Sequence, residues 1–218
     1  MYQKLLAFNF TRIVSMPRNA IIVLLILTGS LFAKAKSSFL PKTFEANFVK
    51  EEKAILSGKT LKVEGQIFYK YPSRIRLEEQ GNEKSVFVSN PFKTFYYKPP
   101  VFEGVPGELT VNKSNSYPLT RFLDSLRNGL ESNDLYKVKK KKELIDFTFT
   151  KKGINELKIA KAQIGFTNKI DFHHVKYVEI VLDNDKKVRF VLDHVKVGGK
   201  LKEGLFDFKA PKGTRVSQ

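Results

Sequence analysis

Large apolar side chains recur at every second position in a series of short segments along this chain. In "VEGQIFYKYPSRIRLEE" (63–79), one register carries Ile67, Tyr69 and Leu77, and the other is mostly charged. Because successive side chains of a strand point to opposite faces, the pattern predicts strand structure with one apolar and one charged face, interrupted at Pro72. The chain must therefore build a sheet and cover its apolar face.

The same alternation predicts further strands, most of them joined as sequential hairpins. The predicted hairpins pair 43–54 with 61–71, 84–90 with 93–99, 143–153 with 154–162, and the two halves of 175–197 around a turn at 183–185, and a last strand covers 204–211. Nine or ten strands in one mostly antiparallel sheet must curl or close. We therefore expect a mainly β fold, a curved and unclosed antiparallel β-barrel around a hydrophobic cavity.

One stretch, "YPLTRFLDSLRNGL" (117–130), breaks the two-residue period. Its apolar side chains fall on one helical stripe, which includes Leu119, Phe122, Leu123 and Leu126. Pro118 suits the first helical position, Ser116 is a candidate cap, and Gly129 is a stop signal. A short helix between strands can bury such a stripe only across the hollow of the sheet, so we expect it to act as a lid.

The N-terminus has the three parts of a secretory signal peptide. Basic residues precede the apolar run 20–32, and Ala-Lys-Ala follows it. We expect cleavage after Ala35, export to the periplasm, and a single mature domain over 36–218. Met16 is an alternative start, and an uncleaved anchor is an alternative to cleavage.

The chain has no cysteine and a formal net charge of +17. The absence of cysteine excludes a disulfide scaffold, thiolate metal ligands and a lipid-modified N-terminal cysteine. The high positive charge favours anionic partners. Because we expect the protein to be exported, nucleic acid is not the expected partner. The basic run "KVKKKK" (137–142) is open to two interpretations, a site for an anionic polymer in a structural envelope protein or a solvated strand end.

Catalytic and metal-binding patterns are missing from the sequence. His173 and His174 are adjacent, so in a strand they would point to opposite faces and could not share a metal. No G-x-S-x-G motif is present. We expect no enzyme activity and no cofactor.

Several segments, in order, resemble the outer-membrane lipoprotein carrier family, LolA. They are "FEANFVKEE", "GQIFYKYPSRIRLEE", "SVFVSNPFKTFYYKPP" and "GLFDFKAPKGTRV", and the likeness covers about residues 43–216. The resemblance implies an open barrel with a helical lid over a hydrophobic cavity that holds lipoprotein acyl chains in transit from the inner to the outer membrane. It also implies an inner-membrane lipoprotein-releasing transporter and an outer-membrane acceptor as partners, and we expect a monomer.

On this hypothesis, one set of side chains lines the acyl-chain cavity and another forms the lid. The predicted wall residues are Tyr69, Tyr71, Ile75, Leu77, Val86, Val88 and Tyr96, and the predicted lid residues are Leu119, Phe122, Leu123 and Leu126. Plain core packing is the alternative for each wall residue. A carrier of another envelope lipid, or a sensor of mislocalised lipoprotein on the same fold, is the alternative function.

Three features depart from the family pattern. Tyr71 stands where the best-described carriers have an arginine that ties the lid to the barrel, and Leu77 stands where an aromatic residue is usual. The family's N-terminal helix is reduced to "KSSFLPK" (36–42). Because a tyrosine hydroxyl can hydrogen-bond the lid only without charge, we expect a more loosely held lid.

Overall fold

A computed structural model of the chain describes residues 38–53, 58–81, 84–113 and 117–217. This part forms twelve strands that belong to one sheet. The strands are β1 (Thr43–Lys53), β2 (Thr60–Lys70), β3 (Arg74–Glu79), β4 (Ser85–Ser89), β5 (Lys93–Lys98), β6 (Glu108–Lys113), β7 (Tyr136–Lys140), β8 (Leu144–Phe149), β9 (Ile159–Phe166), β10 (Val175–Leu182), β11 (Lys187–Val197) and β12 (Arg215–Ser217).

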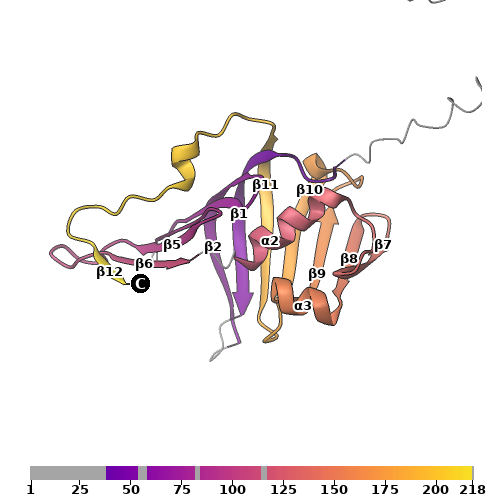
Figure 1. The fold of residues 1–218 in the computed structure, drawn as a ribbon, viewed down its shortest axis with the longest axis horizontal. Coiled ribbons are helices and arrows are strands. Elements are labelled where there is room, and N and C mark those ends of the chain that lie inside the picture. The colour runs from indigo at the N-terminus through magenta and orange to yellow at the C-terminus, as the bar shows by residue number, and fades with distance from the viewer. Residues whose placement is uncertain (1–37, 54–57, 82–83, 114–116, 218) are drawn as a thin grey trace, which may run out of the picture. The chain divides into compact units, whose positions relative to one another are not determined.

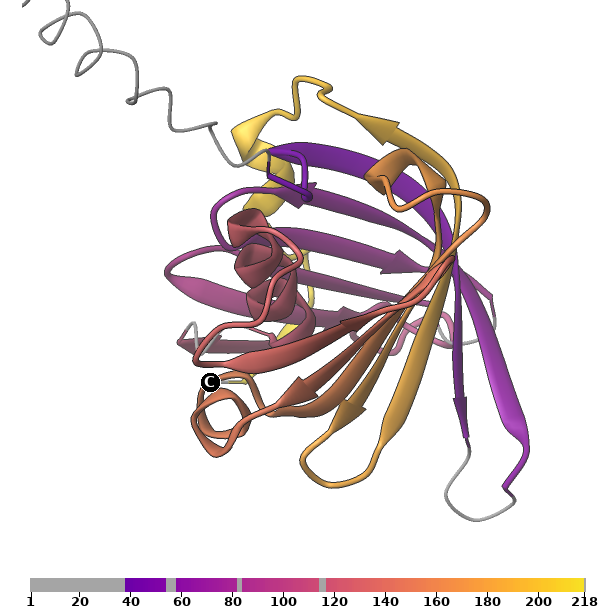
Figure 2. The same cartoon turned by 90° about the vertical axis from the view of Figure 1, so that its right-hand side faces the viewer.

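The sheet order is β12-β6-β5-β4-β3-β2-β1-β11-β10-β9-β8-β7, so β12 and β7 are its two edges. All neighbours are antiparallel except β12 and β6, which are parallel. Figures 1 and 2 show that the sheet curls around a helix on its concave side without closing. The predicted fold class is therefore confirmed.

The helices are short. They are α2 (Pro118–Ser125), α3 (Lys151–Leu157), and the 3-10 turns η1 (Leu126–Asn128), η2 (Phe172–His174) and η3 (Glu203–Phe206). Pro118 begins α2 as predicted, and Gly129, with φ of 93°, ends η1. No helix in the described ranges has the length and apolarity needed to cross a membrane. The predicted signal peptide and the cap at Ser116 lie outside the described residues.

The segment 63–79 folds as two strands, and Pro72 lies in the turn between them. β2 and β3 pair so that Ile67 faces Leu77 and Tyr69 faces Ile75. The turn preserves the alternation, so the apolar register of both strands points to the concave face of the sheet. We call this face the inner face. The hairpins β1–β2, β4–β5 and β10–β11 are confirmed as predicted.

One predicted strand is confirmed in part, and another is wrong. The predicted pairing of 143–153 with 154–162 is present as the antiparallel pair β8–β9, but β9 begins only at Ile159. The segment 154–162 begins as helix α3, because the Thr150 side chain caps that helix by accepting a hydrogen bond from the Gly153 amide. The segment 204–211 forms η3 and extended chain, and the last strand is β12 instead. Strands β6, β7 and β12 were not predicted.

The inner face and α2 share one large apolar cluster. Phe48 of β1 packs directly over Gly65 of β2, where a Cβ atom would lie 2.5 Å from the ring and 2.3 Å from the Glu78 carbonyl oxygen. Only glycine fits there, so the two central strands approach closely under the ring. A register shift in β1 between Glu45 and Asn47 interrupts its ladder with β11, and such irregularities bend a strand.

Candidate functional site

Helix α2 lies across the concave side of the sheet (Figure 2). All four predicted lid residues, Leu119, Phe122, Leu123 and Leu126, are at most 2% exposed and belong to the inner cluster. The Phe122 ring meets the rings of Phe147 and Phe149 edge-on, at centroid distances of 5.3 and 5.8 Å. The helix therefore fills the hollow over β8 with its own side chains.

Three predicted wall residues, Tyr69, Ile75 and Leu77, are buried in this same cluster. Tyr96 pairs with Phe87 across β4 and β5, so both belong to the inner face, but Tyr96 is 40% exposed. Phe87 was not predicted, although it packs against the inner cluster. The structure thus brings four of the seven predicted wall residues onto one face.

Val86 and Val88 lie on the opposite, outer face, so their prediction as wall residues is wrong. They belong to a second apolar cluster, the outer cluster, whose buried members are Val88, Phe95, Tyr97, Leu109 and Phe206. The cause is register: Leu77 of β3 pairs with Phe87, which puts Phe87 on the inner face and its two neighbours outside.

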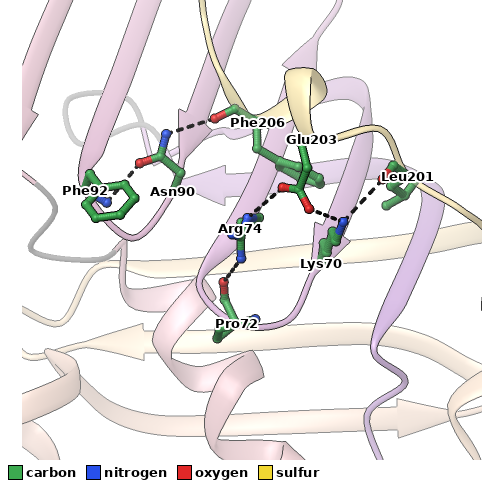
Figure 3. A network of polar contacts seen from close by, with 8 residues as sticks. All are labelled: Lys70, Pro72, Arg74, Asn90, Phe92, Leu201, Glu203 and Phe206. Carbon is green, nitrogen blue, oxygen red and sulfur yellow. Dashed lines mark hydrogen bonds and ion pairs between the residues drawn. The ribbon is translucent and has the colours of Figure 1, made fainter.

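The C-terminal segment covers the outer cluster and is held by polar contacts (Figure 3). Glu203 forms ion pairs with Lys70 and with Arg74, the latter at 3.2 Å. The Asn90 side-chain amide donates to the Phe206 carbonyl oxygen at 3.0 Å. These contacts explain why 204–211 is not a strand: it crosses the sheet and buries Phe206 against it.

Helix α2 is tied to the β2–β3 turn by a carboxylate whose role is not apparent from the sequence pattern. One oxygen of Asp124 accepts from the Tyr69 hydroxyl at 2.6 Å, and the other accepts from the Ser73 amide at 2.9 Å and hydroxyl at 2.8 Å. Ser73 has a φ of 57°, which the two contacts hold in place. We call these three residues the Asp124 anchor.

Burial of the Tyr69 hydroxyl, and next its hydrogen bond to Asp124, raise the pKa of Tyr69 far above its ordinary value. Tyr69 therefore stays a proton donor to the carboxylate. A hydrogen bond to an ionised acceptor is about twice as strong as a neutral one. The charge of this tie comes from the helix instead of the strand. The expectation of a more loosely held lid stays a prediction.

Tyr71 contacts the lid region through its ring. The Arg127 guanidinium lies 5.2 Å from the centre of the Tyr71 ring, and it also donates to the Leu40 carbonyl oxygen. Tyr71 is 42% exposed, so it lies at the rim of the hollow and does not form part of a buried wall. Arg127 thus joins the end of the lid to the N-terminal segment and to the β2–β3 turn.

Beyond the lid, the inner face is open. A groove of about 630 Å³ lies over the ends of β1 to β5. Its lining includes apolar side chains and charged ones, namely Leu61, Val63, Tyr96 and Val101, and Lys50, Glu52, Glu79, Lys84 and Lys98. Lys50 pairs with Glu79, which also accepts from the Ser85 hydroxyl. Pockets for small molecules commonly measure about 300–1,000 Å³, so this groove is large enough for a ligand.

Tyr117 separates the groove from the lid cluster. It precedes α2, and its ring lies 4.5 Å from that of Phe87. The residue as a whole is half-buried, but its hydroxyl is buried. Burial of the hydroxyl, and next the negative charges of Glu79 and Glu52, raise the pKa of Tyr117 to about 12. The concave side therefore has a part filled by α2 and an open part, with Tyr117 between them.

This pKa predicts how stability changes at alkaline pH. A phenol with a raised pKa in the folded state stabilises the fold fully below its unfolded pKa of about 10. We expect that contribution to be lost as the pH rises from about 10 to about 12. Tyr117→Phe should flatten the decline in the free energy of unfolding, measured by urea titration at each pH. An unchanged slope would contradict the burial of this hydroxyl.

Other residues noted in the sequence lie away from the lid. His173 and His174 are in η2, not a strand, and both are near the Asp171 carboxylate, at 3.0 and 3.5 Å. The basic run 137–142 begins on the edge strand β7, and lysines on an edge discourage pairing with other chains. Its Lys140 and Lys141 form ion pairs with acidic side chains of the same domain.

The family "Outer membrane lipoprotein carrier protein LolA" matches residues 41–209. No curated protein that was compared matches the chain significantly. A DUF1329 family protein from Desulfovibrio piger is 11% identical, with 77% of this chain and 90% of that chain covered and a TM-score of 0.40. A putative outer membrane lipoprotein-sorting protein domain from Vibrio parahaemolyticus is 11% identical, with 76% and 89% covered and a TM-score of 0.34.

The family match extends from the segment before β1 to the residues that cover the outer cluster, and so includes the sheet, the lid and the Asp124 anchor. The chain belongs to the LolA family of outer membrane lipoprotein carrier proteins.

Proposed function

We propose that the protein carries the acyl chains of lipoproteins across the periplasm, from the inner to the outer membrane, inside the hollow that α2 fills when the carrier is empty. An inner-membrane transporter would load it and an outer-membrane acceptor would unload it. The observation that supports this proposal most is the lid: an apolar helix stripe buried on the inner face but anchored by a few polar contacts at one end.

The mechanism is a competition for one apolar surface. Each methylene group that leaves water gains roughly 0.8 kcal/mol, so partial burial of a chain of about 16 carbons offers on the order of 10 kcal/mol. Undocking α2 costs the burial of four large side chains, which is a comparable amount. A bound acyl chain that replaces the stripe of α2 therefore needs no large change in the sheet.

The groove gives an acyl chain a way in. It is continuous with the inner face, and apolar side chains such as Leu61 and Val63 line it. Tyr117 lies between the groove and the lid cluster, so a chain that advances from the groove meets the first turn of α2. We propose that it enters here and displaces α2 outward from the sheet, so that the apolar stripe of the helix then covers the bound chain.

The test is to identify the lipid or lipoprotein that is bound to the purified protein. The protein is purified from the periplasm of cells that make acylated lipoproteins, and its lipid and protein contents are identified by mass spectrometry. Co-purified acylated lipoprotein, in a complex that stays soluble without detergent, is the expected result. Free phospholipid alone would favour a carrier of another envelope lipid, and an empty protein that solubilises no acylated substrate would refute the carrier proposal.

A further inference from the structure

The groove opens at an end of the sheet that carries an exposed apolar loop. The connection between β5 and β6, residues 99–107, reads "PPVFEGVPG". Val101 and Phe102 are 76% and 73% exposed, and Val105 is 50% exposed. Val101 also lines the groove, so the loop forms part of its rim. Large apolar side chains are rarely left this exposed in a cluster unless they bind something.

The loop presents these side chains in a fixed turn. The Val105 amide donates to the Phe102 carbonyl oxygen at 3.3 Å, and Gly104 takes the left-handed conformation, with φ of 81°, that this turn requires. At the base of the loop, the Arg215 amide at the start of β12 donates to the Gly107 carbonyl oxygen at 2.8 Å. The exposed side chains are therefore held outward by the backbone.

Basic side chains accompany the apolar ones. Lys84 and Lys98 are exposed and line the same groove as Val101. Glu103 is the only charged residue between 99 and 107, at the apex of the turn. Apolar side chains beside lysines match the two layers of an anionic membrane surface, an acyl boundary beneath phosphate headgroups. The carboxylate of Glu103 restricts entry to the headgroup region.

We propose that this loop docks the open end of the groove onto an anionic lipid bilayer. Phe102 and Val105 enter the headgroup region, and Lys84 and Lys98 contact lipid phosphates. The inference rests on the proposed function for its purpose, since docking would let an acyl chain pass between bilayer and groove without crossing water. The membrane contact itself is a separate property that can be measured on the empty protein.

The chain has no tryptophan, so a single substitution gives a local probe. The full chain carrying Phe102→Trp is mixed with vesicles of phosphatidylglycerol or of phosphatidylcholine. Phe92→Trp is the matched control, because Phe92 is 79% exposed and lies at the opposite end of β5. Any contact made by the N-terminal apolar run is common to both variants.

We expect Phe102→Trp emission to shift to shorter wavelength, and to be quenched by lipid brominated near the headgroup, on phosphatidylglycerol vesicles. The half-saturating lipid concentration should be at least about tenfold lower than on phosphatidylcholine, because each lysine near an anionic surface strengthens binding by about fivefold. Salt should weaken this binding. Emission of Phe102→Trp that stays unchanged on both vesicles, or an equal response from Phe92→Trp, would overturn the inference.

A second variant separates this inference from the carrier proposal. Phe102→Ser combined with Val105→Ser should lose vesicle binding and still take up an acylated lipoprotein from detergent micelles. Vesicle binding that survives in the double variant would refute the docking role of the loop. If the unchanged protein docks on vesicles but takes up no acyl chain, the carrier proposal fails while the docking inference stands.

Discussion

Leu123→Glu is expected to abolish the retention of acyl chains. Leu123 is 2% exposed in the inner cluster, and a carboxylate there would lose its hydration without gaining a partner. Loss of the apolar contacts and burial of the charge should together cost at least about 3 kcal/mol. The lid should undock, and bound acyl chains should dissociate at least about tenfold faster because the stripe no longer covers them.

The matched control introduces a glutamate on the other side of helix α2. Arg121 lies on α2 outside the apolar stripe and is half-buried. Arg121→Glu changes the charge by two units, against one for Leu123→Glu, yet we expect it to leave acyl retention near that of the unchanged protein. Transfer of a fluorescent acylated substrate to acceptor vesicles measures both. Equal transfer by Leu123→Glu and the unchanged protein would show that α2 is not the lid.

Asp124→Ala is expected to act in the opposite direction. It removes the acceptor of three hydrogen bonds and leaves the Tyr69 hydroxyl and the Ser73 amide without their partner. Hydrogen bonds to a charged group contribute about 1.5–3 kcal/mol, so docking of the lid should weaken by about 2 kcal/mol. Since the closed lid competes with the cargo, apparent acyl affinity should rise by up to about 30-fold.

Asp124→Asn separates the charge of the anchor from its shape. An asparagine oxygen can still accept from Tyr69 or Ser73, so both the loss of stability and the gain in affinity should be smaller than for alanine. Acyl affinity is measured by titration with a fluorescent fatty acid, and stability by urea unfolding. If Asp124→Ala lowers acyl affinity, the anchor is part of the binding surface and not a restraint on the empty lid.

Alternation predicted much of the sheet because most strands have one apolar and one polar face. It could not orient β4, since "SVFVS" is apolar in both registers and only its pairing with β3 decides which face each side chain takes. It also misassigned α3, where Gly153 suggested a hairpin turn but the spacing of Ile154 and Leu157 is helical. Local pattern therefore identified elements better than it identified their faces.

The buried apolar stripe of α2 could be predicted from the sequence, and its role as a lid stays a prediction; the Asp124 anchor could not be predicted. The stripe is a local feature, with a period visible in eight residues. The anchor joins residues 51 positions apart, and a lone aspartate on the polar side of a helix resembles any solvated charge. The groove was also missed, because it depends on how far β1 and β2 extend beyond the lid. Such contacts follow from tertiary packing, which periodicity does not encode.

The central claim is that α2 must leave the inner face before an acyl chain can enter. Since the chain has no cysteine, Ser73→Cys with Asp124→Cys gives one thiol pair at the anchor, which a disulfide or a short bifunctional reagent can join. We predict that the cross-linked protein takes up no fluorescent acyl chain and that reduction of the disulfide restores uptake to at least the level of the unchanged protein. Uptake by the cross-linked protein at the uncross-linked level would contradict the account.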